Sequence, residues 1–394
     1  MFWKRKRFLI PVLLVFLFYG LPNLINQQER AAFNRVDQLA IAQSSFANKE
    51  VRDSINRGIS SFYKTSVLGE MLLGQHHRKL WSTKVNLPVF NGLDTLTFVK
   101  TGGGQQTTSV ELKDRNKKRY AFRSVNKDNS NALPSFLRPS LVRPFIRDQA
   151  SALNPYSGPV IAKLLKSLEI AHPEPVIYVV PYRDPIDSTI IMLAGEVVIM
   201  EEELNKRWVG SPKFDRPEQI LNTNDMFMLV QKDQLEIDAR LFLRCRLFDF
   251  LISDWDRHSK QWKWGVYDGV AKPIPIDRDM AFCKYEDGWA SKVVRIFNNK
   301  FQSYTLNEIK VDGLTKNSLP LDKKILPNLK EEVFRQEANY LQRALKDSII
   351  KNAFKAYPPE IYEQVGPTHI KILKKRLSEL ESVSGSFFNL VNGD

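Results

Sequence analysis

The chain is poor in cysteine and histidine, with two cysteines and five histidines among 394 residues. Cys245 and Cys283 cannot form a disulfide framework, and no Cys-x-x-Cys pair is present to bind zinc. The sequence leaves a single bridge between them open, and it places Cys245 in an apolar helical run where a buried thiol is expected. The chain also lacks a P-loop, a Gly-x-Gly-x-x-Gly fingerprint and a short-period repeat, which argues against the protein classes built on them.

Acidic residues are too few to balance the basic ones. Lysine and arginine number 58 against 44 acidic residues, for a net charge of +14. Such a charge permits attraction to nucleic acid, anionic lipid or phosphorylated substrates. The cations are scattered and no nucleic-acid-binding motif accompanies them, so nucleic acid is not an expected partner. A basic surface on a membrane-bound protein is the favoured interpretation.

The N-terminus contains an uncharged run. The 21 residues from Phe8 to Gln28 have no charged side chain, and as a helix they would span roughly 30 Å, the thickness of a bilayer core. The preceding cluster Lys4–Arg7 should stay in the cytoplasm, which would place the main domain outside the membrane, in the periplasm. A cleaved signal peptide is the alternative. We favour an uncleaved signal anchor, because no clear small-x-small cleavage site follows the apolar run.

Composition and periodicity divide the chain into four parts. Residues 1–28 are the expected transmembrane segment, 29–90 a helical stalk with helices over 29–47 and 49–64, 91–205 a strand-rich part, and 206–394 a helix-rich part. The adjacent pair His76-His77 is expected in a polar surface turn. The fold class predicted is α+β, with two lobes.

One constellation of residues indicates chemistry. A long apolar helix is followed by Asp254-Trp255-Asp256-Arg257-His258 and then Gln261, and Asp277 and Asp279 come some fifteen residues later. Phosphoryl transfer needs one carboxylate to orient the acceptor and further oxygen ligands to hold Mg²⁺ on the phosphates. Carboxylate and amide oxygens suit Mg²⁺ or Mn²⁺. The spacing therefore predicts a metal-dependent phosphotransferase.

Asp-Arg-His, an amide five residues after the aspartate and a later Ile-Asp resemble the catalytic segments of atypical kinases. These include phosphatidylinositol kinases, HipA toxin kinases, spore-coat CotH kinases and secretory-pathway Golgi kinases, and the segment is most similar to a bacterial envelope group. The resemblance is strong over 235–285 and weaker over 95–205. It implies a two-lobed kinase-like domain that binds ATP and a divalent metal and phosphorylates an unknown protein, lipid or sugar hydroxyl.

The resemblance also implies roles for individual residues. Asp256 would be the catalytic carboxylate, with His258 beside it, most simply as a hydrogen-bonding residue of the loop. Gln261, Asp277 and Asp279 would be the metal ligands. Gln261 departs from the pattern, because these families usually have asparagine there. The longer arm of glutamine puts catalytic activity in question more than the fold.

Nucleotide contacts are expected from the strand-rich part. Gly102, Gly103 and Gly104 lie between two predicted strands, where backbone amides could approach phosphates, although a plain hairpin turn explains them equally well. The third strand offers Arg123 where a kinase has lysine, with Lys127 and Lys100 as rivals and Asp148 as a candidate acidic partner.

Glu201 follows a later strand, at the place where a hinge would contact adenine. A solvated acidic turn is the alternative.

Three hypotheses follow from the sequence. The first is an active, membrane-anchored kinase-like enzyme. The second is a catalytically weak pseudokinase or scaffold of the cell envelope, favoured by Gln261, by the missing strand lysine and by the scarcity of ATP outside the cytoplasmic membrane. The third is a basic lipid or nucleic-acid binder, for which no aromatic and basic binding surface is evident.

Overall fold

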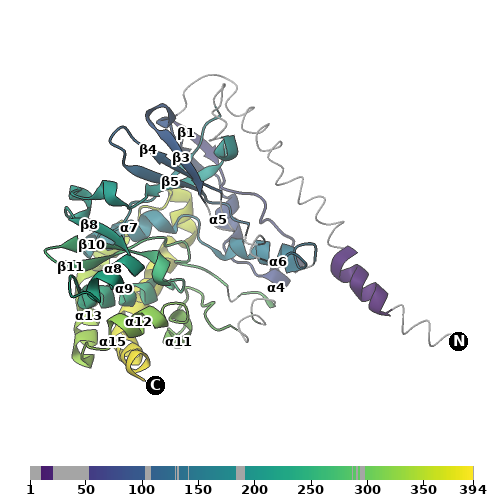
Figure 1. The fold of residues 1–394 in the computed structure, drawn as a ribbon. Coiled ribbons are helices and arrows are strands. Elements are labelled where there is room, and N and C mark those ends of the chain that lie inside the picture. The colour runs from purple at the N-terminus through teal and green to yellow at the C-terminus, as the bar shows by residue number, and fades with distance from the viewer. Residues whose placement is uncertain are drawn as a thin grey trace.

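The computed structural model describes residues 10–20, 53–102, 108–128, 130, 133–140, 142–182, 191–285, 287–289, 292 and 298–393. The protein has a mixed α+β architecture, with strands concentrated in the first half and helices in the second, so the predicted fold class is confirmed at that level. Figure 1 shows the strand-rich half beside a helical half that ends in the long helix α15 (Pro359–Asn392).

Within the described residues, no helix combines the length and the apolar character needed to cross a membrane. The backbone is helical over 10–20, ending in the π-helix η1 (Phe16–Gly20). The rest of the predicted span over 8–28 lies outside the described residues, as does the predicted helix over 29–47.

The segment before residue 90 differs from the predicted helical stalk. The predicted helix over 49–64 is wrong where the structure describes it, because β1 (Ser54–Arg57) is a strand that pairs antiparallel with β2 (Val85–Pro88). Helices α4 (Val67–Leu73) and α5 (Arg78–Ser82) lie between these strands. Tyr63 and Trp81 are buried in the main hydrophobic core. Residues 53–90 therefore pack as part of the domain.

A five-stranded sheet dominates the first half. Its strands are β3 (Thr97–Gly102), β4 (Ser109–Lys113), β5 (Arg119–Ser124), β6 (Val176–Val179) and β7 (Val197–Glu202). Their order across the sheet is β3-β4-β5-β7-β6, and all neighbours are antiparallel. Helices α6 (Val142–Asp148), η4 (Gln149–Ala152) and α7 (Ser157–Ser167) connect β5 to β6.

The second half combines a small sheet with helices. The sheet order is β8-β10-β11-β9, from β8 (Gln219–Asn222), β9 (Glu236–Ile237), β10 (Trp262–Tyr267) and β11 (Val270–Pro275). The helices are α8 (Thr223–Val230), α9 (Ala239–Ile252), α11 (Val311–Leu314), α12 (Leu319–Ile325), α13 (Glu331–Ala344), α14 (Asp347–Phe354) and α15. Helix α15 continues through Pro367.

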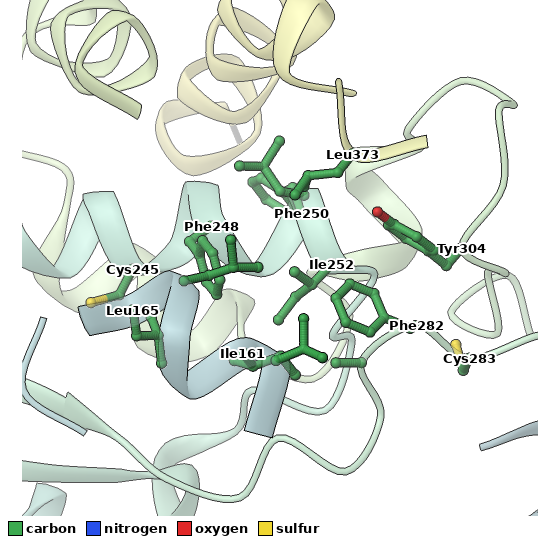
Figure 2. Packing of buried hydrophobic residues seen from close by; sticks show 14 of the residues in the cluster. Ile161, Leu165, Cys245, Phe248, Phe250, Ile252, Phe282, Cys283, Tyr304 and Leu373 are labelled. Carbon is green, nitrogen blue, oxygen red and sulfur yellow. The ribbon is translucent and has the colours of Figure 1, made fainter. Parts of the chain in front are cut away.

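Helix α9 is the central element of the core. The Asp238 carboxylate caps it by accepting a hydrogen bond from the Leu241 N–H, and Ser253 in the left-handed conformation ends it. Phe248 and Phe250 on α9 lie near Ile161 of α7 and Leu373 of α15 (Figure 2). Its almost wholly buried surface fixes the position of the loop that follows.

Both cysteines are buried, and no disulfide joins Cys245 to Cys283. Burial raises the pKa of the Cys245 thiol to about 12, which keeps it protonated and unreactive. The prediction of a buried Cys245 is confirmed.

The His76-His77 pair is buried, so its assignment to a surface turn was wrong. A ring nitrogen of His77 lies 2.8 Å from the Phe282 carbonyl, and a ring nitrogen of His76 lies 2.8 Å from the Ser151 hydroxyl. Burial lowers the pKa of His77 to about 4 and that of His76 to about 3. These histidines are neutral core residues, and they connect the start of α5 to Phe282 and to Ser151. Protonating them would oppose folding.

Candidate functional site

The loop after α9 brings the predicted catalytic residues to the edge of the β10–β11 hairpin. Ser253 has φ of 58°, and this left-handed turn redirects the chain out of the helix. Arg257 then donates hydrogen bonds to the carbonyls of Ile276, Asp277 and Gln261, at 2.8, 3.2 and 3.0 Å. This buried guanidinium therefore joins the loop at 254–258 to the segment that contains the two later aspartates.

The hairpin brings Gln261 and Asp277 together. Trp262 at the start of β10 pairs with Pro275 at the end of β11, so the residues just outside the strands are neighbours. The Ile276 N–H donates to the Gln261 carbonyl at 3.1 Å, and the Gln261 side-chain amide donates to the Asp277 carboxylate at 3.1 Å. Asp277 has φ of 54°, a left-handed conformation that aspartate tolerates better than most residues.

Asp279 lies opposite a lysine from the first half of the chain. The Lys127 ammonium, which is buried, forms an ion pair with the Asp279 carboxylate. Burial alone would lower the pKa of Lys127, but Asp279 and Asp277 raise it above its ordinary value. Burial raises the pKa of Asp279 despite this ion pair, whereas Lys127 and Arg123 hold the pKa of Asp277 below its usual range against the effect of burial.

Arg123 and Glu201 form a second ion pair beside these acids. They lie on adjacent strands, β5 and β7, as diagonal neighbours within reach of long side chains. Glu201 raises the pKa of Arg123, and Asp277 and Asp279 add to the effect. Burial raises the pKa of Glu201 to about 7, although Arg123 opposes the shift. In the structure, Glu201 is thus the partner of Arg123.

Asp256 is partly accessible to solvent, with 25% of its side chain exposed. Its carboxylate accepts a hydrogen bond of 2.7 Å from the Asn317 side-chain amide. His258 Nε2 lies 4.0 Å from the same oxygen, and its Nδ1 accepts from the Lys260 N–H at 3.2 Å. His258 therefore caps the short turn η8 (Ser259–Gln261), and Asn317 holds Asp256 in position.

A buried charge network lies beneath the loop. Asp249 of α9 is paired with the three guanidinium groups of Arg246, Arg257 and Arg278. Arg246 also pairs with Asp322 at 2.9 Å, and Arg278 lies 3.4 Å from Asp254. The guanidinium groups hold the pKa of Asp249 below its ordinary value, against the effect of burial. The network connects α9, the loop at 254–258, the Asp277–Asp279 segment and α12.

A small cavity adjoins the ion pairs. It is lined by Arg123, Lys127, Glu201 and Asp279 and, on the other side, by residues of α7 such as Ile161. Its free space is about 60 Å³.

The oxygen ligands here suit a hard divalent cation. Asp277, Asp279 and the Gln261 amide group provide carboxylate and amide oxygens. Within the part of the chain that the structure describes, no three His, Cys, Asp or Glu side chains form a metal-binding group. A metal would therefore depend on Gln261, on water and on phosphate oxygens to complete its shell. Gln261 would have to turn its amide oxygen toward the ion, because it now presents the amino group to Asp277.

The glycine triplet is only partly described. Gly102 is exposed at the end of β3, while Gly103 and Gly104 lie outside the described residues. The register places Gly102, Ser109 and Arg123 in one row across three strands, which puts Gly102 roughly 10 Å from Arg123.

Several site residues were difficult to find from the sequence. The sequence offered Lys127 only as a rival to Arg123. What distinguishes Lys127 is the burial of its side chain against the Asp279 carboxylate. Asp148 does not face Arg123, since it pairs with Arg78 of α5 at 2.6 Å. Asn317 and Asp249 were not predicted, because their partners are distant in the chain or belong to a buried network.

No protein-family model matches the chain, and no curated protein matches it. One similar solved structure is the Helicobacter pylori proinflammatory kinase CtkA, with 12% sequence identity and a TM-score of 0.36. The match covers 76% of this chain and 98% of that one. At this level of similarity, the match does not by itself establish a shared fold.

Proposed function

We propose that the protein is a membrane-anchored, kinase-like phosphotransferase that uses ATP and Mg²⁺ or Mn²⁺ on a hydroxyl acceptor. The observation that supports it most is the convergence of Asp277, Asp279 and Gln261 with the cations Lys127 and Arg123. Kinases need such a set, with a strand cation for the phosphates, two oxygen ligands for metal and a loop carboxylate for the acceptor. The sheet order β3-β4-β5-β7-β6, with helices α6 and α7 between β5 and β6, agrees with the two-lobed fold that the sequence resemblance implies.

Each of the proposed site residues would have a distinct role in the reaction. Lys127 and Arg123 would bind the donor phosphates in place of their present carboxylate partners. A bound divalent metal, held by Gln261, Asp277 and Asp279, would neutralise phosphate charge. Asp256 would orient the acceptor hydroxyl and take its proton as the hydroxyl oxygen bonds to the γ-phosphorus and the bond from that phosphorus to ADP breaks.

A catalytically weak pseudokinase or scaffold is the alternative function. Two observations favour it. Lys127 and Arg123 are already paired with Asp279 and Glu201, and the cavity beside them is narrow. Such a protein would bind nucleotide weakly or would bind it without turnover.

Titration of the full-length protein with an ATP analogue, with and without Mn²⁺, tests the proposal. We expect metal-dependent binding that Lys127→Met weakens by about 10- to 100-fold, because it removes a charge-assisted hydrogen bond. Lys100→Met is the matched control, since Lys100 is exposed on β3 and pairs with Glu111. Absence of binding to any nucleotide, or equal weakening by both variants, would contradict the proposed site.

A further inference from the structure

Helix α4 is apolar and has no buried residue. Its sequence is Val-Leu-Gly-Glu-Met-Leu-Leu, and the exposed fractions are 77% for Val67, 66% for Leu68, 67% for Met71 and 48% for Leu72. A seven-residue helix is too short to be stable in water by itself. An apolar face of this kind on so short a helix implies that something covers it.

Trp289 is a further exposed apolar residue, in the segment that contacts the C-terminal end of α4. The Gly288 backbone lies directly against the end of α4, because a Cβ atom at Gly288 would fall 2.4 Å from the Gly74 nitrogen. Asp287 accepts a hydrogen bond of 2.8 Å from the His76 N–H, which fixes the two segments to each other. Trp289 follows immediately and is 67% exposed. We call Val67, Leu68, Met71, Leu72 and Trp289 the α4 patch.

Lysines flank the α4 patch along the chain. Lys64 precedes the helix and is exposed, and Lys292 is exposed and donates its backbone N–H to the Gly288 carbonyl. Lys284 is partly exposed and neutralises Asp287 at 3.0 Å. Glu70 is the one acidic residue of α4, and it lines the neighbouring groove together with Lys64. Lys64 and Lys292 therefore flank the patch along the chain as exposed cations.

We propose that the α4 patch inserts into the surface of an anionic lipid bilayer. Apolar aliphatic side chains, an exposed tryptophan and flanking lysines are the features of segments that lie in the membrane interface, where the apolar side chains enter by roughly 5–10 Å. The lysines then attract anionic head groups. The uncharged run over 8–28 lies about forty residues before α4 in the chain. This inference deepens the membrane attachment in the proposed function and is independent of phosphoryl transfer.

Insertion of the α4 patch would fix the orientation of the domain relative to the membrane. A single N-terminal anchor alone would leave the domain free to rotate. A second contact through the α4 patch fixes which face of the domain is turned toward the lipid.

A fluorescent probe on α4 tests the inference in the full-length protein. Leu68→Cys is labelled with the environment-sensitive dye NBD, which is selective because Cys245 and Cys283 are buried. The protein is placed in phosphatidylcholine bilayers with roughly one-quarter phosphatidylserine. Met228→Cys, at a 53% exposed apolar position on α8, is the matched control. We expect the emission at residue 68 to shift to shorter wavelength and to be quenched by nitroxide-labelled lipid, with neither effect at residue 228.

Other outcomes separate this inference from the proposed anchor. Membrane association without quenching at residue 68 would overturn the α4 inference and leave the anchor intact. A wavelength shift without lipid quenching would show that α4 is covered by protein, either a second copy or the chain's own N-terminal segment. That result would also overturn the α4 inference. Loss of membrane association altogether would contradict the anchor. A Leu68→Glu, Met71→Glu variant, labelled at Trp289→Cys, should show less quenching while association persists.

Discussion

Asp256→Asn is expected to lower phosphoryl transfer by about 100- to 10,000-fold, the usual contribution of a positioned general base. The amide preserves the shape of the side chain and the contact with Asn317, but it cannot accept the acceptor's proton. Nucleotide affinity should be unchanged, because Lys127 and the Asp277–Asp279 segment form the proposed binding site. The measurement is transfer of labelled phosphate from ATP by the full-length protein.

Asp268→Asn is the matched control for this experiment. Asp268 is exposed in the turn between β10 and β11 and has φ of 48°, a conformation that asparagine adopts as readily. It should retain full activity. Equal labelling by the parent protein and Asp256→Asn would show that Asp256 has no catalytic role. Nucleotide binding without labelling by the parent protein would favour the pseudokinase alternative.

Asp249→Ala is expected to destabilise the fold by about 3–5 kcal/mol, the range measured when one partner of a buried ion pair is removed. The change would leave Arg246, Arg257 and Arg278 buried together without the carboxylate that compensates them. The measurement is chemical or thermal unfolding of the full-length protein in one fixed detergent.

The control for this prediction is Asp347→Ala. Asp347 is exposed and pairs with Lys374 on the surface, where ion pairs contribute little. It should leave the unfolding midpoint unchanged. If Asp249→Ala is as stable as the parent protein, the buried network does not support the catalytic loop in the way described above.

The catalytic loop was the most predictable part of the site. Asp256, Gln261 and Asp277 occur within a short stretch, and a hairpin between them has few possible geometries. The structure does bring Gln261 and Asp277 into contact. The strands around Arg123 were likewise found from alternation and turn residues.

Side-chain contacts between residues far apart in the chain could not be predicted from the sequence. Lys127 lies outside a strand and gains importance only through burial against Asp279, 152 positions away. Asn317 reaches Asp256 from a separate helical region. The His76-His77 pair looked like a surface turn, because local polarity does not reveal that the core closes over it. Tertiary packing decided each of these cases.

The central claim is that Gln261, Asp277 and Asp279 hold a divalent metal on a nucleotide. A crystal structure of the full-length protein with Mn²⁺ and a non-hydrolysable ATP analogue tests it most directly, because anomalous scattering locates manganese. The account predicts a manganese peak within metal–oxygen bonding distance of Asp277 and at least one of Gln261 and Asp279, with Lys127 moved from Asp279 to a phosphate. A nucleotide bound elsewhere, or manganese that avoids Asp277, would contradict it.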